Sequence, residues 1–334
     1  MNYSVIRHMI TEHDFYALTP KYPKQCDEGM ETFYEYYESK LLKTMQSAKL
    51  KKVDISSDSD MMKTVIKMTE DKKSFEEGGK KITKEWFDAL MNAVVTPPNA
   101  HLIIVHAEFS EKPLIAFLKI NHVKRMDPYY DEGVGSYRIV ERTGLPSKSK
   151  IVPEALIFYP DKKELFIMEQ KFKMQDDKKK RFYLNDYLLF APEVMSSDYD
   201  AMKTVIQTAY AINDELEMID EDLIPLIKKE ILLKRGKKDG LMPVDILTGL
   251  FEGNEQALAT MKIAIEKAGL NDINPITNYS GIGNLDTCKI KTNDDRVITV
   301  DLDDYLEGRN IITENDGGGI TSIQLRNIQS ITIQ

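Results

Sequence analysis

Apolar residues recur every three or four positions in several segments of the chain, which is the spacing of one helix face. The first such segment predicts a helix through Met30, Phe33, Tyr37 and Leu41. The same spacing predicts helices near residues 60–70 and 84–95. The prolines at 97 and 98 end the latter helix, because proline lacks an amide hydrogen and restricts the residue before it.

Two pairs of apolar runs predict β-hairpins farther along the chain. Residues 101–109 and 113–122 flank a polar triplet, and residues 154–159 and 164–171 flank a Pro-Asp-Lys-Lys turn. Residues 123–152 are expected to form a long surface loop, because they contain Gly133, Gly135, Gly144 and Pro146. The first 170 residues are therefore predicted to form an antiparallel sheet with helices on one face.

The centre of the chain returns to helical spacing. One stripe runs through Met202, Val205, Ala209, Ile212 and Leu216. A second helix is expected to begin after the acidic residues 220–222 and to end at the Lys-Arg-Gly of 234–236, since helix dipoles favour these charges at these ends. A third helix is predicted over residues 255–268, closed by Gly269.

Short β-patterned stretches occupy the C-terminal fifth and predict a small meander or barrel-like module. They are residues 285–292, 297–302, 310–315, 319–325 and 328–334. The predicted fold class is α+β: an antiparallel sheet with packed helices, a helical middle region and a small C-terminal β-rich module. We place the N-terminal α+β domain at 1–195, the helical region at 196–270 and the acidic β-rich C-terminal module at 271–334.

Charge is distributed unevenly along the 334 residues. The chain has a net charge of −9, and residues 239–334 carry 7 basic and 15 acidic side chains, a net of −8. The first 238 residues are nearly balanced, with 38 basic and 39 acidic side chains. This acidic total argues against a simple cationic coat on nucleic acid, because phosphate contacts come from clustered lysine and arginine, but it leaves room for a local basic face.

Composition also restricts the compartment. No apolar run approaches the ~18 residues of a membrane-spanning helix, so no membrane partner is expected. The N-terminal segment lacks the basic and apolar regions of a secretory signal. Cys26 and Cys288 stand far apart without a CxxC motif, as is typical of a reducing cytoplasm.

Basic side chains gather in clusters despite the acidic total. The candidate nucleic-acid-binding residues are Lys178, Lys179, Lys180, Arg181, Lys228, Lys229, Lys234, Arg235, Lys237 and Lys238. A single cluster is more often a solvated face or a helix C-terminus, whereas several clusters indicate a dedicated positive face. Lysine outnumbers arginine in them, which favours contact with phosphates over bidentate reading of bases.

One pattern is similar to a catalytic motif. Asp161 in a Pro-Asp pair, followed by Glu169 and Lys171, resembles the PD-(D/E)xK nucleases, in which carboxylates hold a divalent metal. If Asp161 lies in the hairpin turn, roughly 17–20 Å of strand separate it from Glu169 at ~3.3 Å per residue, too far for one metal ion. An alternative pair is Glu154 with Glu169, which face each other if Tyr159 pairs with Glu164.

Three stretches resemble the NdpA/YejK-like family of bacterial nucleoid-associated proteins. They are residues 101–122, 144–171 and 290–331, the last ending in the triplet Arg326–Asn327–Ile328. The segments RFYLNDYLLF and MPVDILTGLFEGNEQALATMKIAIEKAG occupy the expected places between them. The resemblance implies a cytoplasmic protein of the bacterial nucleoid that binds double-stranded DNA, and it supplies no catalytic motif.

These observations favour a non-catalytic protein that binds double-stranded DNA, or a DNA-bound machine, through lysine clusters and largely without base readout. We expect no catalytic residue, no metal ligand and no cofactor, and DNA-associated proteins are further candidate partners. Two alternatives remain: a metal-dependent nuclease of the PD-(D/E)xK type centred on Glu154, Glu169 and Lys171, and a protein–protein adaptor whose acidic module mimics DNA.

Overall fold

The computed structural model describes residues 3–9, 30–56, 58–109, 112–131, 133, 135–217, 219, 222–236, 240–253, 255–270, 273–291, 297–308, 311–315 and 320–325. The chain forms two compact units, Met1–Met195 and Ser196–Gln334. The predicted α+β class is confirmed, since helices accompany antiparallel sheets. No helix among the described residues is long and apolar enough to cross a bilayer.

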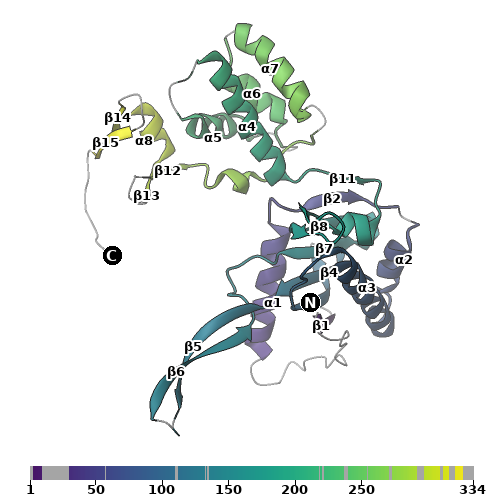
Figure 1. The fold of residues 1–334 in the computed structure, drawn as a ribbon. Coiled ribbons are helices and arrows are strands. Elements are labelled where there is room, and N and C mark those ends of the chain that lie inside the picture. The colour runs from purple at the N-terminus through teal and green to yellow at the C-terminus, as the bar shows by residue number, and fades with distance from the viewer. Residues whose placement is uncertain are drawn as a thin grey trace. The chain divides into compact units, whose positions relative to one another are not determined.

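A seven-stranded antiparallel sheet forms the centre of the first unit (Figure 1). Its strands are β1 (Tyr3–Met9), β2 (Lys51–Asp54), β3 (Ala100–Phe109), β4 (Lys112–Asn121), β7 (Glu154–Tyr159), β8 (Glu164–Met168) and β11 (Glu193–Val194). They lie in the order β1-β3-β4-β7-β8-β2-β11. Both predicted hairpins are confirmed, because β3 pairs with β4 and β7 pairs with β8, with Tyr159 opposite Glu164.

Helices cover both faces of this sheet, so the prediction of helices on one face is wrong. The helix α1 (Met30–Met45) packs Tyr37 and Leu41 against one face, which includes Ile103 and Val105. The helices α2 (Asp60–Lys67) and α3 (Lys72–Ala93) pack against the other face, which includes Leu102 and Ile104. Successive side chains of a strand point to opposite faces, so strands that are apolar at every position must be covered twice.

The helix α3 begins well before the predicted start at residue 84. Asp71 caps it by accepting a hydrogen bond from the amide of Ser74 at 2.8 Å. Phe75 and Ile82, both fully buried, extend the apolar stripe toward this end. The Gly78–Gly79 pair obscured that stripe, but a Cβ at Gly79 would lie 3.0 Å from Ile104 Cδ1, so the glycine allows the helix to approach the sheet closely.

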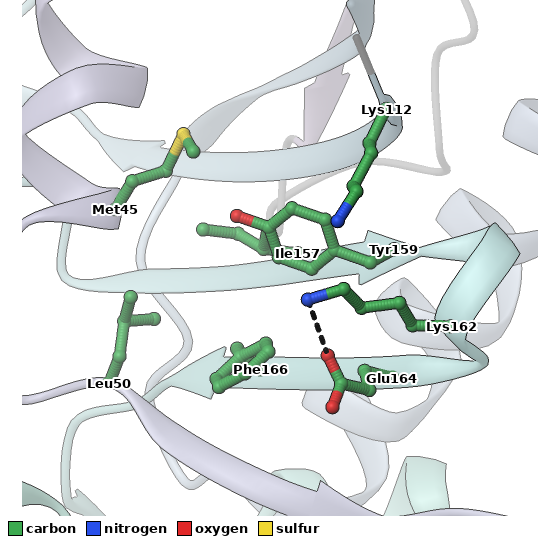
Figure 2. A pocket seen from close by; sticks show the side chains of 8 residues that line it. All are labelled: Met45, Leu50, Lys112, Ile157, Tyr159, Lys162, Glu164 and Phe166. Atoms are coloured by element: carbon green, nitrogen blue, oxygen red, sulfur yellow. Dashed lines mark ion pairs between the residues drawn. The ribbon is translucent and has the colours of Figure 1, made fainter. Parts of the chain in front are cut away.

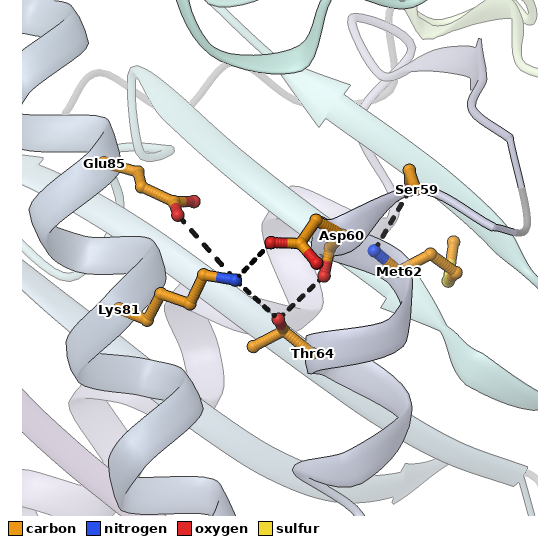
Figure 3. A network of polar contacts seen from close by, with 6 residues as sticks. All are labelled: Ser59, Asp60, Met62, Thr64, Lys81 and Glu85. Carbon is orange, nitrogen blue, oxygen red and sulfur yellow. Dashed lines mark hydrogen bonds and ion pairs between the residues drawn. The ribbon is translucent and has the colours of Figure 1, made fainter.

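Polar contacts join α2 to α3 at the surface (Figure 3). The ammonium of Lys81 lies 2.7 Å from a carboxylate oxygen of Asp60 and 3.3 Å from the hydroxyl of Thr64. Ser59 caps α2, because its hydroxyl accepts a hydrogen bond from the amide of Met62 at 3.2 Å. The cap and the ion pair hold the short helix α2 in place, while Met61, Met62 and Val65 are buried beneath it.

The expected loop at 123–152 is instead largely a β-ribbon. Strands β5 (Val123–Asp131) and β6 (Ser136–Gly144) pair without interruption, from Val123 opposite Gly144 to Asp131 opposite Ser136. The ribbon forms a separate two-stranded sheet that extends away from the central sheet of the first unit (Figure 1). The ribbon was not predicted, because its apolar residues are interspersed with charged and turn-forming residues and do not face a core.

Helices form the core of the second unit. They are α4 (Asp198–Leu216), α5 (Leu223–Lys234), α6 (Pro243–Leu250) and α7 (Glu255–Ala268). The predicted stripe of α4 is buried at Met202, Val205, Ala209 and Ile212. Asp222 caps α5 as its acidic start predicts, whereas α6, which begins at a proline, was not predicted.

The described strands of the predicted C-terminal module form two short β-hairpins in separate two-stranded sheets, rather than one meander or barrel. Strands β12 (Thr287–Lys291) and β13 (Val297–Asp301) form the first, and β14 (Ile311–Asn315) and β15 (Ile320–Leu325) form the second. The short helix α8 (Leu302–Glu307) lies between the two hairpins in the chain, with Asp301 as its cap. The stretch expected at 328–334 lies outside the described residues.

Replacing Ser59 by alanine is expected to lower the free energy of unfolding by about 1 kcal/mol, because the amide of Met62 loses its capping acceptor. Urea unfolding followed by circular dichroism measures the loss. Ser59→Asn is the matched control and should retain most of the stability, since asparagine caps as well as serine. Equal losses in both variants would contradict a capping role.

Candidate nucleic-acid interface

A small hairpin carries the first predicted lysine cluster. We call residues 171–181 the lysine hairpin; its strands are β9 (Phe172–Lys173) and β10 (Lys180–Arg181). Met174, fully buried, fixes it to the end of α3, where it forms a bridge with Val94. The side-chain amide of Gln175 also donates to the carbonyls of Met91 and Val94, at 2.8 and 3.1 Å. The loop is therefore held by the core.

The lysine hairpin presents a concentration of positive charge. It has six basic and two acidic residues, a net of +4. Lys173 lies directly opposite Lys180, and both are exposed, as are Lys178 and Lys179. No carboxylate of the described residues forms an ion pair with these four ammonium groups. Like charges placed directly opposite each other destabilise a β-pair, so this arrangement has an electrostatic cost in the free protein.

Arg181 differs from the lysines beside it. Its guanidinium lies 2.5 Å from a carboxylate oxygen of Asp176, 3.3 Å from Asp177 and 3.8 Å from Asp186. The hydrogen bond from Arg181 is the largest effect on the pKa of Asp176, which it lowers. Arg181 thus pairs with the acidic residues of the hairpin, whereas the exposed positive charge comes from the lysines.

Lys228, from the second predicted cluster, is a structural residue. Only 6% of it is exposed, and its ammonium donates to the carbonyls of Asn284 and Thr287, each at 2.7 Å. Burial lowers its pKa. These contacts attach α5 to the segment that leads into β12 and use two of the three ammonium donors of Lys228 inside the protein.

The other members of that cluster have different surroundings. Lys234 donates to the carbonyl of Asp245 at 2.8 Å and lies 3.0 Å from Glu230, while Arg235 lies 4.0 Å from Asp286. Lys229 is exposed. Lys237 and Lys238 lie outside the described residues. The second cluster belongs to the second unit, so the two clusters do not form one site within either unit.

Glu154, a residue of the nuclease alternative, belongs to a buried ion pair. Glu154 lies directly opposite Lys119 in the sheet, and the two form an ion pair with fully buried side chains. The ammonium of Lys119 also donates to Asn121 at 3.0 Å. Near them, Trp86 donates to the hydroxyl of Tyr183 at 2.7 Å, and burial raises the pKa of Tyr183 well above its usual value, an effect that Glu154 reinforces.

Glu169 has a partner of its own beside this pair. Lys51 lies 3.4 Å from its carboxylate, and only 4% of the Glu169 side chain is exposed. Burial raises the pKa of Glu169, and the nearby Glu154 adds to this effect, whereas Lys51 lowers it. The ammonium of Lys171 lies 5.2 Å from the ring centre of Phe182, and the ammonium of Lys51 lies 3.9 Å from the same centre.

The contacts of Asp161, Glu154 and Glu169 decide whether these carboxylates can hold a metal ion together. Asp161 is exposed in the hairpin turn, Glu154 contacts an ammonium, and Glu169 contacts another. Among the residues that the structure describes, no group of three His, Cys, Asp or Glu side chains could hold a metal ion. The buried site is therefore arranged as two ion pairs. Lys119 was not among the predicted site residues, although a single lysine within the apolar run LIAFLKI is a signal for a buried, paired charge.

A separate pocket opens on the α1 side of the sheet (Figure 2). Its volume is about 380 Å³, and its apolar walls come from Met45, Leu50, Ile157, Tyr159 and Phe166. The ammonium groups of Lys112 and Lys162 lie beside the ring of Tyr159, with Lys162 3.9 Å from Glu164 (Figure 2). Such a lining suits a small molecule with an apolar body and an anionic group.

Comparison of the chain with models of known protein families finds no match, and comparison with curated proteins finds none either.

The buried pair should show strong coupling in a double-mutant cycle. Lys119→Met and Glu154→Leu are each expected to lower the free energy of unfolding by about 3–5 kcal/mol, because each leaves one buried charge without its partner. The double variant should recover most of this loss, since no charge then remains. Urea unfolding of all four proteins measures the coupling. Additive losses would contradict a mutual role for the two side chains.

Proposed function

We propose that the protein binds double-stranded DNA without cutting it, and that the lysine hairpin supplies the phosphate contacts. The observation that carries this proposal is the register of β9 and β10, which places the exposed Lys173 and Lys180 opposite each other without a carboxylate partner among the described residues. A polyanion that binds between them would remove their repulsion. The resemblance to nucleoid-associated proteins favours the same ligand and a place in the bacterial nucleoid.

The chemistry of the hairpin favours binding without base readout. Lysine ammonium groups are flexible point charges, which suit phosphate oxygens but lack the planar fork that reads guanine. Each phosphate that is neutralised releases condensed counterions, so the affinity comes from charge and is similar for all sequences. Because Met174 and Gln175 anchor the hairpin to α3, little conformational freedom is lost when DNA binds.

Neutralising the exposed lysines should weaken DNA binding in a salt-dependent way. The triple variant Lys178→Gln, Lys179→Gln and Lys180→Gln is expected to reduce the slope of log affinity against log salt by up to about 2.7, at ~0.9 per phosphate contact. Fluorescence anisotropy with a labelled duplex at several salt concentrations measures the slope.

A charge-matched control comes from the second unit. Lys203, Lys262 and Lys267 are exposed there, and their replacement by glutamine removes the same charge without touching the hairpin. This control should leave the slope essentially unchanged. Equal effects of both triple variants would indicate a general charge effect and contradict a site at the lysine hairpin.

The absence of cleavage separates this function from the nuclease alternative. Incubation of supercoiled plasmid with the wild-type protein and Mg²⁺ or Mn²⁺ is expected to leave the plasmid intact. Glu169→Gln should bind duplex DNA as the wild type does, because Glu169 contacts Lys51 rather than the lysine hairpin. Plasmid cleavage by the wild type that disappears in Glu169→Gln would establish the nuclease instead.

A further inference from the structure

The β5–β6 ribbon carries large apolar side chains into solvent. Among them are Met126, Tyr137 and Ile139, which are 66%, 76% and 77% exposed. The two hydrophobic clusters of the first unit contain none of the three. An isolated two-stranded ribbon is marginally stable in water, and a contiguous exposed apolar surface usually marks an interaction site.

The register of the ribbon separates its two faces. Residues paired across an antiparallel ribbon point to the same side, and the sides alternate along each strand. One side, which we call the apolar face, therefore contains Met126, Pro128, Tyr130, Tyr137 and Ile139. The rings of Tyr130 and Tyr137 pack edge to face with their centres 5.1 Å apart. The opposite side contains Arg125, Asp127, Tyr129, Arg138, Val140 and Arg142.

The charges of the ribbon argue against a polyanion as the occupant of the apolar face. Residues 123–144 contain four basic and four acidic side chains, so the ribbon is neutral. On the apolar face, the charged pair is Lys124 and Glu141, which lie 2.8 Å apart at the end nearer the central sheet. Because this ion pair forms within each ribbon and the ribbon is neutral overall, its apolar face meets no net charge repulsion from a second copy of itself.

We propose that the apolar faces of two ribbons, one from each of two copies of this chain, pack together about a two-fold axis. Pro128 and Ile139 lie opposite each other at the middle of the face. A two-fold axis that lies between the ribbons and crosses the strands at this pair places the tyrosine pair of one ribbon over Met126 and Glu141 of the other. The same contact is then made twice, as an isologous interface requires.

The available area is sufficient for such a dimer. Large apolar side chains contribute on the order of 150 Å² each when covered, so the apolar face offers roughly 500 Å². Two ribbons would together bury about 1,000 Å², the lower bound of a stable protein interface. The dimer is therefore expected to be reversible, with the tyrosines and Ile139 providing its centre.

Sedimentation of matched variants tests this dimer without reference to DNA. The wild type is expected to show a concentration-dependent equilibrium between monomer and dimer. Ile139→Glu should raise the dissociation constant roughly 100-fold or more, because it places charges at the centre of an apolar contact. Val140→Glu makes the same change on the opposite face and should leave the equilibrium unchanged. Circular dichroism of each variant establishes that the protein is folded.

Cysteine cross-linking tests the position of the axis. In the Cys26→Ser background, Ile139→Cys should form a covalent dimer with bismaleimidoethane, a short cross-linker that joins two thiols, because ribbons that pack face to face hold facing Cα atoms about 10 Å apart. Arg138→Cys, on the opposite face, should not. A wild type that remains monomeric at all concentrations would overturn the dimer, as would equal effects of Ile139→Glu and Val140→Glu. A monomer whose DNA affinity falls in Ile139→Glu would assign the apolar face to DNA instead.

Discussion

The central strands of the first unit bury side chains on both of their faces, and the remaining architecture depends on this constraint. β4 is buried without interruption from Leu114 to Ile120, so neither face of the sheet can remain in water. The helix α1 covers one side and α2 with α3 cover the other. Lys119 and Glu154 are the charged exceptions, and because they lie directly opposite each other, each neutralises the charge that the other brings into the interior.

The helix α3, which covers one face of the sheet, also holds the lysine hairpin in place. The strand β8 ends at Met168, and shortly after it the buried Met174 forms a bridge with Val94 at the end of α3. The exposed lysines therefore stand on a loop whose backbone is bonded to the end of a core helix. A loop held in this way would lose little backbone entropy on binding a ligand.

The regular elements were predictable wherever the apolar pattern reflected burial. The β3–β4 and β7–β8 hairpins and the stripes of α4 and α7 follow from it directly. The start of α3 was not predicted, because Gly78 and Gly79 interrupt its apolar pattern. These glycines leave room for the side chains of Met68 and Ile104, which lie outside α3. The candidate site was predictable in part: the lysines at 178–180 are exposed, but nothing near Lys228 in sequence indicates burial, since its acceptors lie 56 and 59 residues away. The β5–β6 ribbon was predicted as a loop because its apolar residues do not face a core.

The two unusual surfaces of the first unit have complementary physical properties. The lysine hairpin is charged, so the proposed contact with DNA would weaken as salt screens it, whereas the ribbon is neutral and apolar, so the proposed dimer contact would be largely insensitive to salt. A handful of phosphate contacts alone gives weak, sequence-independent binding. If the ribbon joins two copies, each dimer carries two lysine hairpins, and contact of both with one duplex would give the second contact a high effective concentration. The net −8 of residues 239–334 opposes contact with phosphates, so the proposed DNA contacts belong to the lysine hairpin of the first unit.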